Sequence, residues 1–208
     1  MDQNQSEFPA ITPTAKNGEE RFTFQGGDLG CQLKDFWSWY ASDLVGNTLR
    51  GCLAEFIVAK ALGCVGGVRT EWDACDVKTR AGIKIEVKSA AYIQSWRQAR
   101  PSKISFGIAP TQGWNADTND YSRHAVRQAE IYIFCLLGHQ DQASINPLEL
   151  SQWDFLVVPT WVLNQSAPKQ KRITLGSLTK LEHRRVDFGG LQEAVDWAAS
   201  FSPVCSSS

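Results

Sequence analysis

The sequence predicts a mixed α/β domain, and three features of the chain support this prediction. Its 208 residues, of which 43% are apolar and 21% charged, have the composition of one globular domain of ordinary size. Segments with the apolar spacing of helices lie near both ends of the chain. Short apolar or alternating segments, which are typical of strands, lie between them. Helices and strands in this order favour a single domain in which helices pack against a sheet.

The first third of the chain is expected to be helical after a flexible start. Residues 1–27 contain two prolines and only scattered apolar side chains, so we expect a loosely attached N-terminal arm. Asp28 is a plausible helix N-cap. The segment from there to Leu62 is rich in Leu, Phe, Trp and Ala, with an interruption near Gly46. It therefore predicts two consecutive helices, the second at about 48–62.

The remainder of the chain is expected to form strands and a closing helix. Residues 91–100 lack alternation and predict a helix or an ordered loop, and the polar residues 112–123 predict an exposed excursion. Residues 191–201 predict a closing helix, which completes a single domain over 28–202 ahead of a disordered tail at 203–208. The expected strands cover residues 68–72, 76–79, 83–88, 130–137 and 154–158.

Hydropathy, the N-terminal residues and the cysteine spacing indicate where the protein is located and which kinds of site are not expected. The formal charge is −1. The longest apolar run, Ile131–Leu137, is far shorter than the ~20 residues that cross a bilayer, so no membrane partner is expected. The N-terminus lacks the basic and apolar stretches of a secretory signal, which predicts a cytoplasmic location. The six cysteines include no C-x-x-C pair and the three histidines lie far apart, which argues against a zinc site and, in a reducing compartment, against disulfides.

Residues 75–89 predict a β-hairpin that gathers charged side chains. Gly82 can adopt the positive φ that a tight turn requires. After it, Ile83, Ile85 and Val87 alternate with Lys84, Glu86 and Lys88. Because side chains alternate between the two faces of a strand, Glu86 and Lys88 lie side by side, about 7 Å apart. Asp76, on the partner strand, is expected opposite them.

Two carboxylates and one ammonium at one position suit the hydrolysis of a phosphodiester. Magnesium prefers oxygen ligands and typically binds through one or two carboxylates together with substrate phosphate. A lysine beside them can orient or deprotonate the attacking water and can neutralise charge on the phosphate. A bare Glu-x-Lys is expected about once by chance in a chain of this length. The alternative interpretation is therefore a strand face whose alternating charges are only solvated.

Glu55 is a further acidic candidate. Its neighbours three and four positions away on a helix are Gly51, Cys52, Val58 and Ala59. None of them is a cation that could pair with it locally. A carboxylate among small and apolar side chains is expected to be buried or to face a site. The alternative is an ion pair with a distant arginine such as Arg50 or Arg69.

Together these residues resemble the PD-(D/E)XK nuclease superfamily, which has the restriction-endonuclease-like fold. The resemblance covers about residues 28–158 and rests on the order of Glu55, Asp76 and the Glu86-Val87-Lys88 segment. Cys75 stands where the family pattern has a proline. The resemblance implies an αβββαβ core, a mixed sheet flanked by helices. It places Glu55 on the first helix, Asp76 on the second strand, and Glu86 and Lys88 on the third.

The resemblance also implies a catalytic role for each of these residues. Asp76, Glu86 and the main-chain carbonyl of Val87 would ligate a divalent metal, Mg²⁺ with Mn²⁺ as a substitute. Glu55 would assist through water or a second metal. Lys88 would help to activate the nucleophile.

Two polar residues follow the motif. Ser89 and Gln94 stand where some branches of the superfamily place supporting polar side chains. For Gln94 the alternative is an exposed residue on a helix.

Basic residues are concentrated in two segments. Residues 78–103 carry an excess charge of +6 and residues 169–185 an excess of +5, which leaves −12 for the rest of the chain. This segregation favours a basic track for phosphates beside the metal site, with Trp96 and Trp114 as candidate stacking residues. For the second segment a solvated charged surface is equally expected. Candidate nucleic-acid contacts in the first segment are Lys78, Arg80, Trp96, Arg97, Arg100 and Lys103.

The sequence thus predicts a magnesium-dependent endonuclease that hydrolyses phosphodiesters, with DNA as the expected substrate. The alternative is a catalytically inactive protein of the same fold that binds nucleic acid or serves as an assembly module. A third candidate is a structural protein unrelated to nucleic acid. Many members of the superfamily act as dimers, so a homodimer is also considered. The apolar residues Trp153, Phe155, Trp161 and Val162 would then line its interface or else fill the core.

Overall fold

The computed structural model describes residues 11–69, 75–115, 120–121 and 124–201 of the chain. The chain packs into two compact units. The first consists of the residues up to Tyr40 together with Gly66–Thr70, and the second of Ala41–Val65 together with the chain from Glu71 onwards. Every candidate site residue lies in the second unit. The domain limits at residues 28 and 202 stay a prediction.

The first unit contains a β-hairpin and a helix. β1 (Arg21–Phe24) and β2 (Gly27–Gln32) are antiparallel. Between them, Gln25 and Gly26 have positive φ angles of 51° and 82°. Two consecutive positive φ angles produce a tight turn whose twist matches that of the flanking strands. α1 (Leu33–Ala41) follows β2 directly.

The prediction that Asp28 begins a helix is wrong. Asp28 lies in β2, where its carboxylate forms an ion pair with Arg21 on the opposite strand and accepts a hydrogen bond from the Gly30 N–H. These contacts bind the carboxylate within the hairpin, so the first helix begins only at Leu33.

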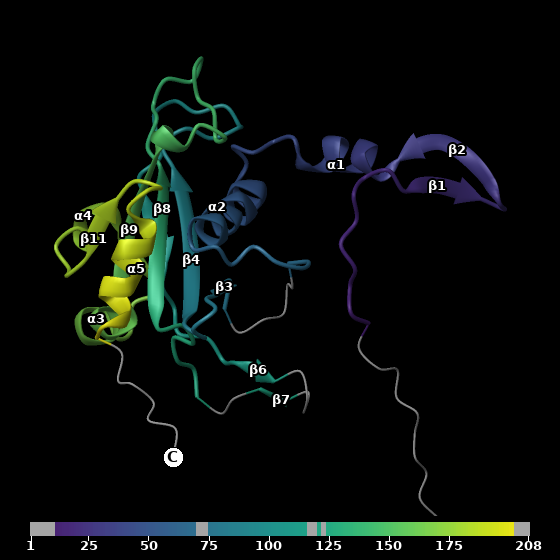
Figure 1. The fold of residues 1–208 in the computed structure, drawn as a ribbon. Coiled ribbons are helices and arrows are strands. Elements are labelled where there is room, and N and C mark those ends of the chain that lie inside the picture. Colours follow the sequence, from purple (N-terminus) through teal and green to yellow (C-terminus); the bar gives the residue numbers. More distant parts are fainter. Residues whose placement is uncertain (1–10, 70–74, 116–119, 122–123, 202–208) are drawn as a thin grey trace, which may run out of the picture. The chain divides into compact units, whose positions relative to one another are not determined.

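The second unit is built on a five-stranded sheet (Figure 1). The strand order is β11-β9-β8-β4-β3, in which β4 and β8 are parallel and all other neighbours antiparallel. The sheet is therefore mixed, as predicted. Its strands are β3 (Val77–Lys78), β4 (Lys84–Ala91), β8 (Ile131–Leu137), β9 (Trp153–Pro159) and β11 (Arg184–Val186).

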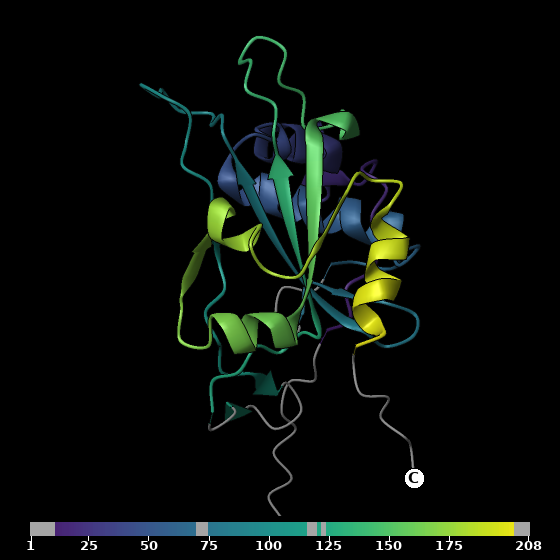
Figure 2. The same ribbon diagram turned by 90° about the vertical axis from the view of Figure 1, so that its left-hand side faces the viewer.

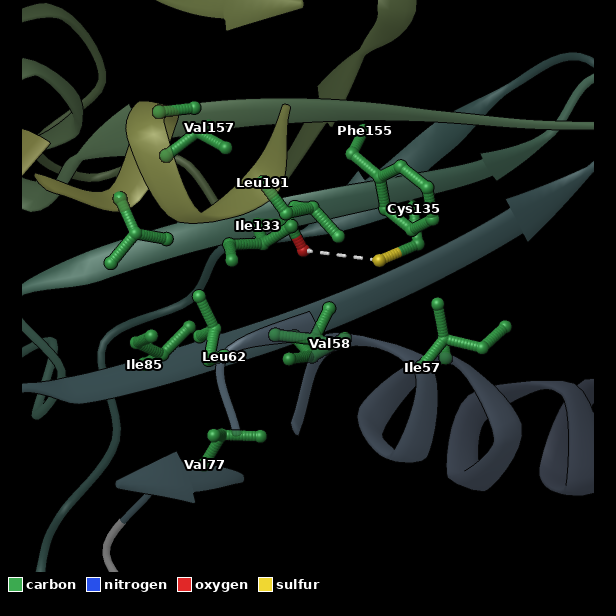
Figure 3. Close-up of a cluster of buried hydrophobic side chains, with 14 of the residues drawn as sticks. Ile57, Val58, Leu62, Val77, Ile85, Ile133, Cys135, Phe155, Val157 and Leu191 are labelled. Atoms are coloured by element: carbon green, nitrogen blue, oxygen red, sulfur yellow. Dashed lines mark hydrogen bonds between the residues drawn. The ribbon is translucent and has the colours of Figure 1, made fainter. Parts of the chain in front are cut away.

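β8, the central strand of the sheet, is buried along its whole length. Because side chains alternate between faces, Ile133 and Cys135 belong to one hydrophobic cluster, whereas Tyr132 and Phe134 belong to another. Figure 3 shows the first cluster, in which side chains of α2 meet those of the strands. A strand with two buried faces has to be apolar throughout, which explains why Ile131–Leu137 is the longest apolar run of the chain.

Helices flank this sheet. The first face is covered by α2 (Asn47–Ala61) and α5 (Leu191–Ala199). Two shorter helices and a small antiparallel sheet cover the second face. These elements are α3 (Thr160–Ser166), α4 (Leu175–Leu178), β5 (Ser105–Gly107) and β10 (Arg172–Thr174). Figure 2 shows α3 and α5 on opposite sides of the strands. None of the helices in the described part of the chain has the length and apolar character required to span a bilayer.

Most of the elements predicted for the second unit are confirmed. The helix expected at about 48–62 is α2, and the closing helix is α5. Four of the five expected strands correspond to β3, β4, β8 and β9. The fifth strand was expected at 68–72. Its last three positions lie outside the described residues, and Val68 and Arg69 are not in a strand.

The connection between β4 and β8 contains no helix in its described residues. The αβββαβ order that the resemblance implies is therefore not met in this part of the chain. Side chains explain the loop: the Gln94 N–H donates to Gln98 Oε1 at 2.7 Å, and the Gln98 amide donates to the Tyr92 carbonyl at 3.2 Å. Such bonds offer the backbone an alternative to helical pairing. The short elements β6 (Trp114–Asn115), β7 (Asp120–Tyr121) and a 3-10 helix (Leu150–Gln152) complete the described structure.

Three of the four residues considered for a dimer interface fill the core instead. Trp153, Phe155 and Val162 are buried within the two hydrophobic clusters. Trp161 is the exception, because it is exposed and packs against Phe201.

Truncation of a core side chain tests the packing of the central sheet. Leu156 on β9 is fully buried, whereas Leu148 is 64% exposed. We expect Leu156→Ala to lower the free energy of unfolding by about 2–5 kcal/mol because it removes buried apolar surface and leaves a cavity. Leu148→Ala should lower it by less than about 1 kcal/mol. Urea unfolding followed by tryptophan fluorescence measures both, and equal effects would contradict the assigned burial.

Candidate active site

The β3–β4 hairpin positions the candidate residues. Its turn is closed by two hydrogen bonds of 2.9 Å, from the Thr79 N–H to the Ile83 carbonyl and from the Gly82 N–H to the Thr79 carbonyl. Gly82 has φ 86°, as predicted. Val77 pairs with Ile85, and the same register carried one residue further places Asp76 opposite Glu86. The turn and the register together therefore bring the two acidic residues to the same place on the sheet.

Asp76, Glu86 and Lys88 form a charged cluster at the end of this hairpin. Lys88 Nζ lies 2.5 Å from Glu86 Oε1 and 3.9 Å from Asp76 Oδ2. The Val87 N–H donates to Asp76 Oδ2 at 2.7 Å, which fixes the Asp76 carboxylate against the backbone of β4. The three side chains are 22–32% exposed, so they are accessible from solvent but largely covered by protein.

The surroundings of the cluster disfavour negative charge on Asp76. Burial raises its pKa to about 6, and the neighbouring Glu86 carboxylate and the more distant Glu55 add to the rise. Lys88 and the Val87 N–H act in the opposite direction but do not cancel it. Both carboxylates therefore compete for one ammonium group, and the cluster has room for additional positive charge.

Tyr132 is a neighbour of the cluster that sequence analysis missed. It pairs with Glu86 across the parallel β4–β8 ladder, and its side chain is buried. Burial raises the pKa of its hydroxyl to about 12, and Glu86 contributes to the rise. Tyr132 lies within an apolar run, and its proximity to Glu86 depends on a pairing between strands some 45 residues apart. No local signal in the sequence could have revealed it.

Glu55 lies on α2 and is half-buried. Its carboxylate raises the pKa of Asp76, which places it within electrostatic range of the cluster. Arg50, one of the two arginines considered as its partner, is hydrogen-bonded elsewhere: to the Val45 carbonyl, Asn47 Oδ1 and Gln94 Oε1.

The two supporting residues lie beside the cluster, along a cavity that also borders Lys88. Ser89 is part of β4, directly after Lys88. Gln94 is 6% exposed, so the alternative of an exposed helix residue is wrong. Its amide nitrogen donates to the Ala91 carbonyl at 2.8 Å, and its oxygen accepts from Arg50. Satisfied polar groups of this kind hold a buried side chain in one orientation.

All six candidate contacts for nucleic acid are exposed, but they lie in three different places in the structure. Trp96 and Lys103 line the cavity next to Lys88. Lys78 and Arg80 lie on the β3–β4 hairpin, and Arg97 and Arg100 on the loop after β4. The side chain of Trp114 lies outside the described residues.

The second basic segment divides between two roles. Arg172 lines the same cavity as Trp96. Arg184 and Arg185 form ion pairs with Glu193 and Asp154 at 2.9 Å and 2.7 Å, respectively. These two arginines are thus partly neutralised within the protein.

Comparison with protein families gives the class of the protein. Residues 38–173, more than half of the chain, match the model of the bacteriophage T4 endonuclease IV family. The chain belongs to the bacteriophage T4 endonuclease IV family. It is thus a nuclease that acts on nucleic acid. No curated protein matches the sequence.

The matched region of this T4 endonuclease IV family member contains α2, β3 and β4, and with them the whole charged cluster. Within the described residues, no group of three or more His, Cys, Asp or Glu side chains is arranged to hold a metal ion. The cluster instead offers two carboxylates and a lysine. Such a set can bind a hard cation only together with water or a phosphate of the substrate.

The repulsion within the cluster can be measured through stability. In metal-free protein at neutral pH, we expect Asp76→Asn to raise the free energy of unfolding by about 1–3 kcal/mol, because it removes a charge that burial and Glu86 oppose. The amide oxygen can still accept the Val87 N–H. Thermal unfolding in the presence of EDTA measures the change.

The matched control is Asp154→Asn, which removes an exposed charge that is paired with Arg185. It should lower stability by up to about 1 kcal/mol. A loss of stability in Asp76→Asn equal to that in the control would show that the charges of the cluster do not oppose one another.

Proposed function

We propose that the protein is a magnesium-dependent endodeoxyribonuclease of the PD-(D/E)XK type. The observation that carries the proposal is the convergence of Asp76, Glu86 and Lys88 at the end of one hairpin. Glu86 and Lys88 on β4, together with Asp76 directly before the paired strand β3, form the set of residues that the sequence resemblance implies, and they lie within the region matched by an endonuclease family.

The arrangement of the helices and strands also supports a nuclease of the PD-(D/E)XK type. α2 carries Glu55 and packs against β4, and Asp76 directly precedes β3, the edge strand paired with β4. The parallel strand β8 and the antiparallel strand β9 complete the sheet on the other side. The loop that replaces a helix between β4 and β8 is where this chain departs from the expected core.

The residues present fit a magnesium ion. The fit rests on the ligand atoms and their electrostatics. Two carboxylates, whose oxygens are the ligands that magnesium prefers, share one cation, the Lys88 ammonium. The pKa of Asp76 is raised by burial and by Glu86, so a further cation would stabilise its charged form. Asp76, Glu86 and the Val87 carbonyl would hold the metal. The Val87 N–H points to Asp76, and the N–H and C=O of one strand residue lie on the same side of the strand.

The metal would polarise the scissile phosphate and make an attacking water more acidic. The protein's own groups provide orientation and charge. Lys88 can donate hydrogen bonds to a phosphate oxygen or to the attacking water and can offset the negative charge that develops in the transition state. Glu55 adds negative charge on the α2 side, where it would assist through water. Exposed cations around the site, including Lys103 and Arg97, would hold the phosphates of the bound strand.

Substitution of the cluster tests catalysis. We expect Lys88→Ala and Glu86→Gln each to lower the rate of magnesium-dependent DNA cleavage by about 10²-fold or more, the scale typical of general acid-base or electrostatic groups. The substrates are supercoiled plasmid and single- and double-stranded oligonucleotides. Lys84→Ala is the matched control, because Lys84 lies on the same strand and face but outside the cluster; it should change the rate less than about threefold. If correctly folded wild-type protein cleaves none of these substrates in the presence of magnesium, the proposal is overturned.

Calorimetry tests the metal site without relying on activity. Titration of the wild-type protein with Mg²⁺ or Mn²⁺ should release or absorb heat, and Asp76→Asn should weaken binding at least about tenfold because it replaces an anionic ligand with a neutral one. Asp154→Asn should bind the metal as the wild type does. A catalytically inactive module would show no metal binding that depends on Asp76.

A further inference from the structure

A cavity of about 370 Å³ lies next to the charged cluster. It is bordered by Lys88 and by the rest of β4 through Ala91, and on another side by residues 102–107. Its volume is within the range of about 300–1,000 Å³ that is common for ligand sites. Lys88 belongs both to this cavity and to the cluster, so a molecule in the cavity would lie beside the proposed cleavage site.

The charged side chains that line the cavity are all basic. They are Arg50, Lys88, Lys103 and Arg172, and no carboxylate of the described residues is among the lining. α2 also begins here with Asn47, and the N–H of the preceding Gly46 donates to the Asp43 carboxylate at 2.9 Å. The Asp43 carboxylate is not part of the lining, so the four cations give the cavity itself a positive potential that attracts an anion.

Arg50 is the unusual member of this group. It is 3% exposed, yet no carboxylate of the described residues lies within ion-pair distance of its guanidinium. Its terminal nitrogens donate only to neutral acceptors, at 2.6–3.1 Å, and Nε has no hydrogen-bond partner. Burial lowers the pKa of Arg50, and the Asp43 carboxylate, which forms no ion pair with it, offsets this only in part. A buried charge that is compensated only in part is unfavourable unless a ligand supplies the rest. Arg50 therefore indicates that the cavity accepts an anion.

The remaining lining suits an aromatic ring beside that anion. Trp96 is 52% exposed and lines the cavity, and an accessible indole is a group on which a base can stack. The hydroxyl of Ser102, which accepts from the Gln94 and Gln98 amides, also lines it. An anionic group combined with a flat ring is the chemistry of a nucleotide.

We propose that this cavity is a subsite for one nucleotide of the substrate strand, the one attached to the phosphate that is cleaved. Its phosphate contacts Arg50, Lys103 and Arg172, and its base stacks on Trp96. The inference rests on the proposed nuclease function, since Lys88 is the residue that connects this subsite to the charged cluster.

Binding of deoxynucleoside monophosphates to the metal-free protein tests the subsite. Calorimetry in EDTA compares a 5′-monophosphate, a 3′-monophosphate, the nucleoside alone and inorganic phosphate. We expect at least one of the monophosphates to bind more tightly than both the nucleoside and the phosphate, because only the nucleotide uses the cations and Trp96 together. Equal affinity for inorganic phosphate and for the nucleotides would overturn the proposal.

Variants identify the side chains responsible. Arg172→Ala and Lys103→Ala replace exposed side chains, and each should weaken nucleotide binding about threefold to tenfold. Because Arg172 also donates to Ser105 Oγ at 2.8 Å, thermal unfolding checks that its variant is folded. Arg50→Lys keeps the buried charge but loses the guanidinium geometry, and it should weaken binding about tenfold or more. Lys171→Ala is the control, because it removes an exposed charge next to Arg172 that does not line the cavity. Equal binding by the Arg172 and Lys171 variants would overturn the proposal.

Kinetics separates this inference from the proposed function. In cleavage assays, Arg172→Ala and Lys103→Ala should lower kcat/KM about threefold to tenfold, in proportion to their loss of nucleotide binding. Nucleotide binding that is lost in Arg172→Ala, in a protein that cleaves no DNA, would support the subsite and overturn only the nuclease mechanism. Cleavage by a protein that binds no nucleotide would overturn the subsite alone.

Discussion

The burial of β8 on both faces is the constraint on which the second unit depends. A central strand that is apolar throughout requires a covering layer on each side, and the chain provides α2 and α5 on one face and α3, α4 and the β5–β10 sheet on the other. β4 pairs with β8 along seven residues, so its direction and register are fixed by this buried strand. Glu86 and Lys88 then lie on β4, next to the edge strand β3, and both are only partly buried.

The charged cluster departs from what stability alone would favour. Two carboxylates that share one ammonium, in a site where burial raises the pKa of Asp76, are a less stable arrangement than a single ion pair. Arg50 shows the same feature with opposite sign: its hydrogen-bond partners among the described residues are neutral, and the Asp43 carboxylate offsets its burial only in part. Groups that oppose folding in this way are concentrated at functional sites, because a ligand supplies the missing charge. The acidic cluster of Asp76 and Glu86 therefore lies next to the basic cavity that contains Arg50, and Lys88 belongs to both.

Features encoded by local sequence could be predicted, whereas those that depend on distant pairing could not. Alternation after Gly82 was enough to predict the hairpin, the face of Glu86 and Lys88, and the position of Asp76, because a strand repeats every two residues. Tyr132 was missed because its place beside Glu86 follows from the β4–β8 pairing. Arg50 and Gln94, 44 residues apart, meet only in the folded chain. The β1–β2 hairpin was missed because its turn, Gln25-Gly26, has a non-glycine residue at a positive φ.

The turn between β3 and β4 has a consequence for how this protein can change over evolution. Thr79 and Ile83 close a three-residue connection whose length sets which residue before β3 lies opposite Glu86. Replacement of Arg80 or Ala81 leaves that length unchanged and should be well tolerated. Because β8 fixes the register of β4, insertion or deletion of one residue in the turn would shift β3 instead, and Asp76 would no longer lie opposite Glu86. The length of this turn is therefore expected to be more strictly maintained among relatives than its sequence.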